Sequence, residues 1–380
     1  MKFTCEKSQL ANAISVASRT VCQKSSIAAL EGILLRAEDR LYLTGYNLET
    51  GITVQLDAQI IRGGDCVMPA RLFFDIIRKL PDDMVTLEVD DKYKVSIRGG
   101  ISSFTIMASS AEDYPDLPRV GEADAVHIPE NALRELIGGT IFAVSENQAR
   151  PIHTGCLIEV AENSVTMVAV DGFRLARRTY HLDEPTGKVM KFVAPAAALK
   201  EVEKILEDTD EPMALTLGAK HILFEIGGAT LICRILEGEF LDWRRVVPTN
   251  NPTILTANVD ELTASIERVG LIVSEKYKSP VRCLFSQDAA QFRTLTTIGA
   301  AKDECSLAGD GKDLEIGFNC RYLLDALKAL PTEYVNLELS NSLSPIVFTP
   351  TQKDKTGENE EKTVYDYAYM VLPVRLKPGE

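Results

Sequence analysis

The sequence contains three copies of one repeat, and this feature limits the possible folds more than any other. Residues 68–81, MPARLFFDIIRKLP, align with residues 318–331, FNCRYLLDALKALP, at an offset of 250 residues. At an offset of 126 residues, YPDLPRV at 114–120 aligns with FLDWRRV at 240–246. A fixed period indicates an array of similar structural units. We place the three repeats at residues 1–121, 122–250 and 251–380.

Each repeat carries the same order of predicted elements. An extended start precedes an amphipathic helix, as at 8–20, where apolar residues recur at helical spacing. Strand-like segments follow, as at 40–47 and 50–60, with β-branched residues in alternation. A second helix is expected after a residue suited to a helix start, namely Pro69, Pro195 and Asn319 in the three repeats. The pattern predicts an α+β fold with three tandem domains, each with two helices packed on antiparallel sheets.

Hairpins and connections complete this outline. The patterns at residues 85–100 and 213–228 each predict two strands joined by a short turn. Segments rich in Pro, Asn or acidic residues at 115–124 and 248–252 are expected to link the repeats. The polar stretch TQKDKTGENEEKT at 351–363 is expected to form a mobile loop before the last strand, YAYMVLPVRL.

The composition limits where the chain works and what it binds. With 41 Lys and Arg against 55 Asp and Glu, the net charge of -14 excludes a basic field over the whole surface, so any contact with nucleic acid must be local. No apolar run approaches the ~20 residues of a membrane span, so we expect no membrane partner and a cytoplasmic location. The 8 cysteines form no C-x-x-C pair and are expected to be reduced thiols in the core.

Catalytic motifs are absent from the sequence. There is no Walker A, G-x-G-x-x-G or G-x-S-x-G pattern, and the four histidines are 26, 28 and 40 residues apart. Such spacing gives no helical pair of imidazoles for zinc, so we expect no cofactor and no metal. His153 and His221 are interpreted as surface residues or as core residues with satisfied hydrogen bonds. The sequence therefore favours a protein that is not an enzyme.

Four motifs together resemble one family. MKFT at the start, VMPARLFFDIIRKLP at 67–81, AVDGFRLARR at 169–178 and YAYMVLPVRL at 367–376 are similar to segments of the bacterial sliding clamps, the beta subunits of DNA polymerase III. The resemblance covers essentially the whole chain. It implies a DNA sliding clamp, or processivity factor, in which two subunits join head to tail in a ring around double-stranded DNA.

Packing arithmetic also favours a homodimer. A domain of about 125 residues has an equivalent diameter of roughly 35 Å, and three in contact leave a hole of about 5 Å. That hole is too small for a duplex whose major groove alone is ~12 Å wide, whereas six domains leave a hole of about one domain diameter. Sheets that continue across the joints would also pair the exposed edge strands. The resemblance places four residues at the dimer interface: Phe104, Ile106, Leu271 and Ile272.

A ring that cannot dissociate without opening needs only weak, sequence-independent phosphate contacts, which let it slide. Candidate DNA contacts on the second helices are Arg71, Arg78, Arg321 and Lys328, and the resemblance adds Lys24, Gln148 and Arg150. Each could also be an ordinary solvated charge. The middle repeat has alanines at 196–198, where family members often carry basic residues, which leaves its share in holding DNA open.

The resemblance also implies a cleft that binds partner peptides near the boundary of the second and third repeats. Its residues would be Gly172, Phe173, Arg174, Leu175, Leu241, Arg245, Val246, Asn319, Tyr322, Pro345, Met370, Val371, Leu372, Pro373, Val374 and Arg375. Val170, Phe173 and Leu241 differ from the residue types expected in the family, which suggests an altered peptide preference. Leu175, Met370 and Val371 could instead be ordinary core residues. The tail at 377–380 extends past the end of many relatives.

The implied partners are the catalytic subunit of DNA polymerase III, the clamp loader, repair polymerases, mismatch-repair proteins and DNA ligase. Two other functions remain open from the sequence. One is a repeat-built enzyme with an active site around Asp171 and Arg174, between the second and third repeats. The other is a monomeric scaffold that does not bind DNA.

Overall fold

A computed structural model of the chain describes residues 1–81, 83–121, 125–273, 279–310, 313–351 and 366–376. Two compact units are present, which we call unit 1 (Met1–Asn131 with Ala197–Ile235) and unit 2 (Ala132–Ala196 with Leu236–Glu380). Most of the loop predicted at 351–363, and the tail at 377–380, lie outside the described residues.

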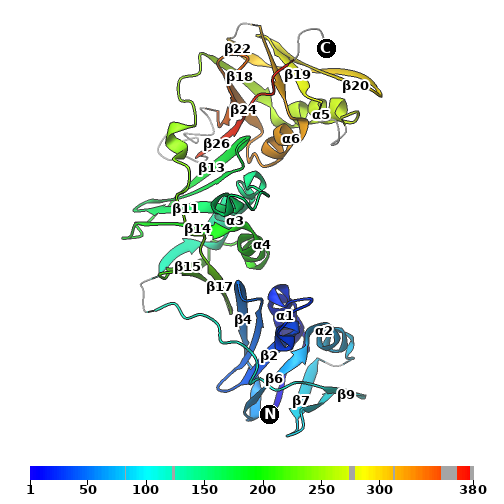
Figure 1. The fold of residues 1–380 in the computed structure, drawn as a ribbon. Helices are drawn as coiled ribbons and strands as arrows, with labels where there is room; N and C mark the ends of the chain where they lie inside the picture. Colours follow the sequence, from blue (N-terminus) through cyan, green and yellow to red (C-terminus); the bar gives the residue numbers. More distant parts are fainter. Residues whose placement is uncertain (82, 122–124, 274–278, 311–312, 352–365, 377–380) are drawn as a thin grey trace. The chain divides into compact units, whose positions relative to one another are not determined.

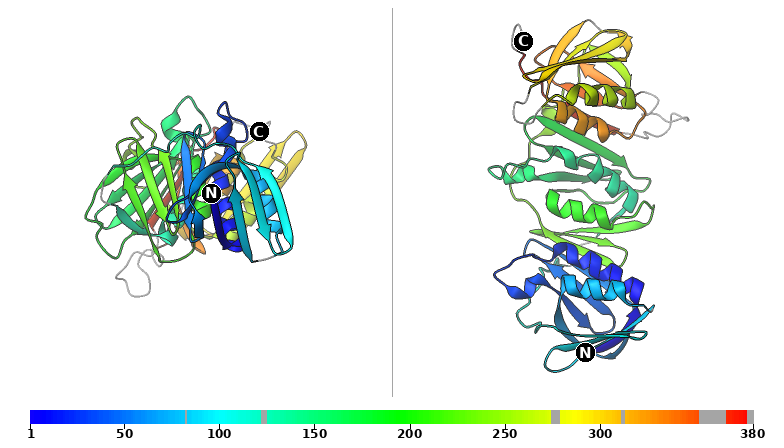
Figure 2. Two further views of the ribbon diagram at one scale, coloured as in Figure 1. Left: turned by 90° about the horizontal axis from the view of Figure 1, so that it is seen from below. Right: turned by 90° about the vertical axis from the view of Figure 1, so that its right-hand side faces the viewer.

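The six α-helices of the described residues fall in pairs along the chain, two in each repeat. They are α1 (Lys7–Ala17), α2 (Ala70–Lys79), α3 (Glu130–Gly138), α4 (Ala196–Ile205), α5 (Val259–Gly270) and α6 (Cys320–Lys328). Short 3-10 turns accompany them: η1 (Ser18–Thr20), η2 (Ala28–Glu31), η3 (Ile141–Ala143), η4 (Pro151–Thr154) and η5 (Trp243–Arg245). In the right-hand view of Figure 2, α1 and α2 lie side by side in unit 1, as do α5 and α6 in unit 2.

Two antiparallel sheets make up most of unit 1. The five-stranded sheet runs β5 (Gln59–Arg62), β1 (Lys2–Glu6), β7 (Met84–Val89), β8 (Lys94–Gly99), β9 (Ser102–Met107). The eight-stranded sheet runs β10 (Val126–Pro129), β15 (Pro212–Leu217), β16 (His221–Ile226), β17 (Ala229–Arg234), β4 (Thr50–Leu56), β3 (Leu41–Tyr46), β2 (Gly32–Ala37), β6 (Gly64–Pro69). Phe3, Leu10, Phe73 and Ile97 are fully buried in the core between these sheets and helices. Each such side chain contributes about 1.5–3 kcal/mol through burial.

Unit 2 is also built on two antiparallel sheets. The nine-stranded sheet runs β14 (Met190–Pro195), β11 (Gly155–Ala161), β12 (Ser164–Val170), β13 (Arg174–His181), β26 (Asp366–Val371), β25 (Ile346–Thr349), β24 (Tyr334–Leu339), β18 (Thr253–Asn258), β22 (Ala308–Asp310). The four-stranded sheet runs β21 (Gly299–Ser306), β20 (Ala289–Thr296), β19 (Val281–Phe285), β23 (Leu314–Phe318).

The sheets continue from one repeat into the next, as the packing argument for a ring led us to expect. In unit 1, β17 of the middle repeat pairs with β4 of the first repeat (Figure 1). In unit 2, β13 of the middle repeat pairs with β26 of the third, and Arg174 lies opposite Val371. Because this pairing satisfies backbone groups that a lone repeat would expose, each joint removes two open sheet edges.

The predicted helix starts and hairpins are confirmed. α2 and α4 begin directly after Pro69 and Pro195, and the Asn319 side chain caps α6 by accepting from the backbone N–H groups of Arg321 and Tyr322. One strand prediction was incomplete. The segment at 50–60 forms β4 and β5, which belong to different sheets. Alternating side chains reveal a strand but not which sheet it joins, so the change of sheet near Asp57 was not visible in the pattern.

No helix among the described residues is both long enough and apolar enough to cross a membrane.

Candidate functional site

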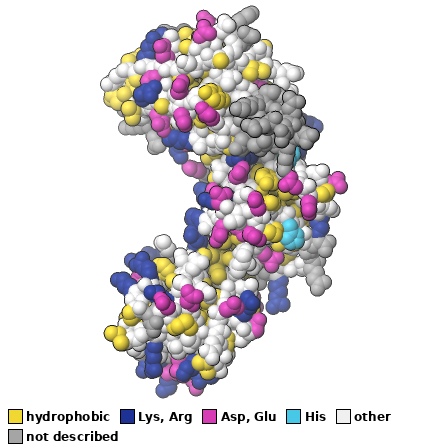
Figure 3. Space-filling model, turned by 180° about the vertical axis from the view of Figure 1, so that it is seen from behind, with side chains coloured by type: hydrophobic (Ala, Val, Ile, Leu, Met, Phe, Trp, Pro, Cys, Tyr) yellow, Lys and Arg dark blue, Asp and Glu magenta, His cyan; other side chains and the backbone are white. Residues whose placement is uncertain are grey.

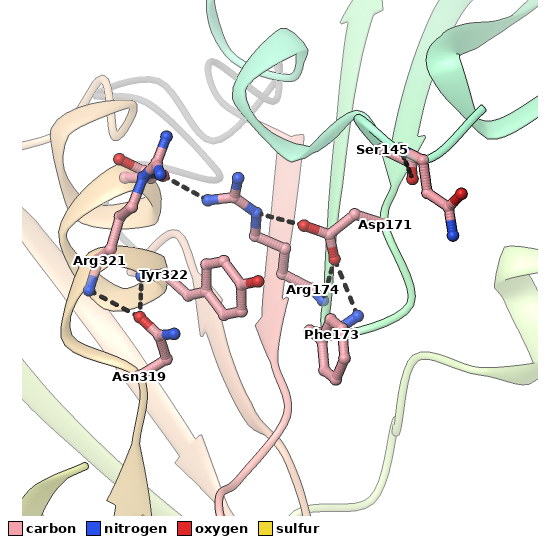
Figure 4. A network of polar contacts seen from close by, with 9 residues as sticks. Ser145, Asp171, Phe173, Arg174, Asn319, Arg321 and Tyr322 are labelled. Carbon is pink, nitrogen blue, oxygen red and sulfur yellow. Dashed lines mark hydrogen bonds and ion pairs between the residues drawn. The ribbon is translucent and has the colours of Figure 1, made fainter. Parts of the chain in front are cut away.

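The turn between β12 and β13 is fixed by the side chain of Asp171. One carboxylate oxygen accepts hydrogen bonds from the backbone N–H groups of Phe173 (2.8 Å) and Arg174 (3.0 Å), as Figure 4 shows. Gly172, between Asp171 and Phe173, has φ of +93°, a left-handed conformation that favours glycine. The sequence Asp-Gly-Phe-Arg therefore folds into a turn that holds Phe173 at the surface, where its side chain is 60% exposed.

Arg174 connects this turn to helix α6. Its guanidinium donates to Asp171 at 2.9 Å and to Asp325 at 2.5 Å, and Asp325 lies on α6 (Figure 4). The same guanidinium lies over the ring of Tyr322, 4.6 Å from the centroid, and 5.6 Å from that of Phe142. The residue is only 7% exposed. A buried, multiply paired arginine of this kind fixes the position of α6 relative to β13.

An aromatic pair lies at the edge of this network. The rings of Phe173 and Tyr322 are stacked, with centroids 6.1 Å apart and an interplanar angle of 24°. Burial raises the pKa of the Tyr322 hydroxyl, and the Asp171 carboxylate raises it further. The hydroxyl is therefore neutral at physiological pH. The pair offers a flat aromatic surface beside a fixed positive charge.

Unit 2 also contains an apolar cluster, which we call the floor cluster. Its buried members are Leu157, Val168, Val170, Leu175, Val193, Phe240, Val347, Ala368 and Met370. Leu175 lies opposite Met370 in the β13–β26 pair. Exposed apolar side chains in the neighbouring segments are Leu241, Val246, Leu372 and Val374. Unit 2 thus combines a rigid buried base with apolar groups that remain open to water.

The sequence-predicted peptide residues divide into three groups. Leu175, Met370 and Val371 are buried, so they serve as core whatever else they do. Phe173, Leu241, Val246, Leu372 and Val374 are exposed, and Asn319, Tyr322, Pro345 and Pro373 are partly buried. Arg245 and Arg375 are exposed, and the Nε atom of Arg245 pairs with Asp242 at 3.0 Å.

Two members of the Arg174 network were missed from the sequence, Asp325 and Phe142. The alignment of Asp325 with Asp75, at the offset of 250 residues, marked Asp325 as a repeated position. No feature of the sequence pointed to its pairing with Arg174, which lies 151 positions away.

The candidate DNA contacts are exposed in both units. They are Lys24, Arg71 and Arg78 in unit 1, and Gln148, Arg150, Arg321 and Lys328 in unit 2. Three of them have acidic neighbours: Arg78 lies 3.7 Å from Asp75, Arg321 lies 3.8 Å from Asp325, and Lys328 lies 2.7 Å from Glu267. A hydrogen bond to Glu267 raises the pKa of Lys328. Figure 3 likewise shows Lys and Arg side chains interspersed with Asp and Glu in each unit, a distribution suited to weak phosphate contacts.

The residues predicted at a dimer interface lie on an edge strand and after a helix. Phe104 and Ile106 belong to β9, an edge strand of the five-stranded sheet, and Phe104 is 39% exposed. Leu271 follows α5 directly and is 83% exposed, and Ile272 is partly buried. An unpaired edge with apolar side chains is a surface that favours association.

Comparison with known proteins gives one consistent answer. Residues 1–118, 127–242 and 244–360 match the N-terminal, central and C-terminal domains of the DNA polymerase III beta subunit. The chain belongs to the DNA polymerase III beta-subunit family. Members of this family are the bacterial beta sliding clamps, which are non-enzymatic processivity factors that act in DNA replication.

Individual relatives resemble the chain over its full length. The beta sliding clamp of Staphylococcus epidermidis is 29% identical and is covered, like this chain, over 99% of its length. The sliding clamp structure from Bacillus subtilis is 28% identical with a TM-score of 0.91, and that of Pseudomonas aeruginosa bound to griselimycin is 28% identical with a TM-score of 0.90. In both cases 99% of this chain and 100% of the other chain are covered.

Membership of the clamp family bears on the two other functions that the sequence left open, the repeat-built enzyme and the monomeric scaffold. A sliding clamp has DNA and polymerase as partners and assembles with itself, so neither the repeat-built enzyme nor the monomeric scaffold is favoured. In this clamp, Asp171 and Arg174 are engaged with each other and with Asp325. The arrangement is that of a structural joint.

Proposed function

We propose that this clamp docks its partner proteins on the surface formed by the Phe173–Tyr322 pair, the floor cluster and the exposed apolar groups around them. The observation that carries the proposal is the 60% exposed Phe173 ring, which is stacked on Tyr322 and held by a turn fixed at two backbone N–H groups. A large aromatic side chain that is both exposed and positionally fixed loses little conformational entropy when a ligand covers it. Such groups are typical anchors of binding surfaces.

The expected ligand is an extended peptide segment with two large apolar side chains. Burial of each contributes about 1.5–3 kcal/mol, and backbone hydrogen bonds and contacts with Phe173 add to this, which supports affinity in the micromolar range. The partners that carry such segments would be the polymerase catalytic subunit, the clamp loader, repair polymerases, mismatch-repair proteins and DNA ligase. Modest affinity would allow these partners to exchange on one clamp. The griselimycin-bound clamp of Pseudomonas aeruginosa supports the capacity of this fold to bind a ligand.

For the DNA function, we propose three domains at 1–121, 122–250 and 251–380, with two copies of the chain closing the ring. Phe104 and Ile106 of one copy would meet Leu271 and Ile272 of the other. Lys24, Arg71, Arg78, Gln148, Arg150, Arg321 and Lys328 would touch phosphates. Because three of these side chains, Arg78, Arg321 and Lys328, are paired with carboxylates, the ring would hold DNA by enclosure and not by affinity.

A peptide titration tests the docking proposal. A Gln-Leu-Ser-Leu-Phe peptide with blocked ends would be titrated into the intact protein, the Phe173→Ala variant and the Tyr334→Ala variant. Tyr334 is the matched control, since it is another exposed aromatic residue of unit 2, on β24. We expect Phe173→Ala to weaken binding about tenfold, equivalent to about 1.4 kcal/mol, and Tyr334→Ala to leave it unchanged. Equal effects in the two variants, or no binding to the intact protein, would contradict the proposal.

Loading onto nicked circular DNA tests enclosure. After loading, the protein is expected to stay bound in high salt and to leave once the circle is cut, because it can slide off the ends. Retention on linear DNA with free ends would contradict topological holding.

A further inference from the structure

His153 lies against the floor cluster of the proposed docking surface. It belongs to the η4 turn, and its imidazole meets the ring of Phe240 edge-on, with centroids 5.5 Å apart and an interplanar angle of 75°. Phe240 is a buried member of the floor cluster, and its neighbour Leu241 is exposed. Ile152, the residue before His153, packs against the same cluster. The imidazole therefore adjoins the floor cluster at Phe240.

The backbone of His153 is fixed on both sides. Its N–H donates to the carbonyl of Arg150 at 3.1 Å, and its carbonyl accepts from the N–H of Ser145 at 2.9 Å. These bonds fix the backbone from which the imidazole projects, and the ring itself contacts Phe240.

The surroundings of the imidazole favour the neutral form. Burial lowers the pKa of His153, and the positive charge of Arg150 on the same turn lowers it further. Two carboxylates on the adjoining segments are paired with cations: Asp242 with Arg245, and Glu159 with Lys191 and Arg244. Glu146, Glu237 and Glu239 also lie on these segments. At neutral pH the ring is thus an uncharged aromatic surface.

We propose that His153 is a specificity-determining residue of the docking surface, whose neutral ring favours an apolar anchor of the peptide and whose protonation weakens docking. The inference rests on the proposed function. It predicts that partner binding by this clamp depends on pH, although a peptide with two apolar anchors carries no titratable group of its own.

The direction of the effect follows from solvation. A peptide anchor that covers the imidazole removes water from it, which penalises the charged form and lowers its pKa in the complex. Affinity is then constant above the pKa of the free protein and falls as the pH decreases below it. Each unit of difference between the free and bound pKa values gives about a tenfold loss of affinity at the low-pH limit.

The experiment is a titration of the same blocked peptide, labelled with tetramethylrhodamine, at several pH values from 8.0 to 5.5. We expect the intact protein to bind about two- to threefold more weakly at the lowest pH, because pH 5.5 is not yet the low-pH limit. In the His153→Leu variant, which cannot titrate there, the affinity is expected to stay constant across the range. The control is His181→Gln, which removes another imidazole of unit 2, 3.5 Å from Asp366, and is expected to keep the full pH dependence.

A second measurement keeps the inference testable if His153→Leu folds poorly. The His153 resonance would be followed by NMR in the intact protein with and without peptide, and its pKa is expected to fall on binding. A flat affinity profile for the intact protein, an unchanged profile in His153→Leu, or a pKa that does not fall would each overturn the role of His153. Absence of peptide binding at pH 8.0 would instead overturn the proposed docking function.

Discussion

Removal of the Arg174 side chain tests whether the joint between β13 and α6 depends on one buried charge. The guanidinium lies 2.9 Å from Asp171, 2.5 Å from Asp325 and 4.6 Å from the Tyr322 ring centroid, and the residue is 7% exposed. Arg174→Ala would leave both carboxylates without this cation.

The expected cost follows from the exposure of the groups left behind. Removal of one partner from a buried ion pair costs about 3–5 kcal/mol, because the remaining charge is desolvated and unpaired. The Asp325 side chain is 30% exposed, so water can reach it and the penalty falls at the low end of that range. We therefore expect Arg174→Ala to lower the free energy of unfolding of unit 2 by about 3 kcal/mol.

Urea unfolding followed by tryptophan fluorescence suits this measurement. The chain has a single tryptophan, Trp243, which packs against the floor cluster and so reports on unit 2. Arg245→Ala is the matched control: its guanidinium also pairs with an aspartate, Asp242, at 3.0 Å, but its side chain is 86% exposed. An exposed pair contributes little, and we expect this control to change the free energy by less than about 0.5 kcal/mol.

A double-mutant cycle with Asp325→Ala isolates the pair itself. Residues in one network couple by about 0.5–3 kcal/mol, and a coupling near the upper end is expected for Arg174 and Asp325. The reasoning would be refuted if Arg174→Ala cost no more than Arg245→Ala, or if the two substitutions in the cycle were additive.

Three further predictions concern other parts of the chain. The pKa of Asp303 is lowered to about 2, chiefly by a hydrogen bond from Arg268, so the pair stabilises the fold at neutral pH and this contribution is lost as pH falls. In thermal unfolding, the Asp303→Asn variant should thus be less stable than the intact protein at pH 7, and this difference in stability should shrink between about pH 4 and about pH 2. A difference in stability that does not change with pH would count against this role of Asp303. Cys22 should be the one thiol that reacts rapidly with a disulfide reagent, because it is partly exposed while the other cysteines are buried, and fast labelling of a second thiol would be inconsistent with this burial. Leu271→Ala should raise the monomer fraction in sedimentation without changing the urea midpoint, since its side chain is 83% exposed, and an unchanged dimer would argue against its place at the interface.

Local features of the sequence predicted local structure. The cap residue Asn319 acts within a few positions of itself, through backbone N–H groups that any helix start offers. The second helix predicted after Pro69 likewise forms as α2. These outcomes need no knowledge of the rest of the molecule.

The candidate site was predicted less completely. The family resemblance pointed to Arg174, Phe173 and Tyr322, and the structure brings these three together in unit 2. It could not show that Leu175 and Met370 are fully enclosed, because apolar residues in a strand can face either a core or a cleft. His153 was interpreted as a surface or satisfied core residue, and its contact with Phe240 was not foreseen.

By itself, the sequence determined the number of repeats, because the copies resemble one another at fixed offsets. It also determined the order of their elements and the positions where helices begin, because these depend on interactions between near neighbours in the chain. Only the tertiary structure decided that Arg174 meets Asp325, that His153 meets Phe240 and that β13 pairs with β26. These partners are separated by 87 to about 190 positions, so which of them meet depends on how the sheets pair across the repeat boundary and on how the core closes.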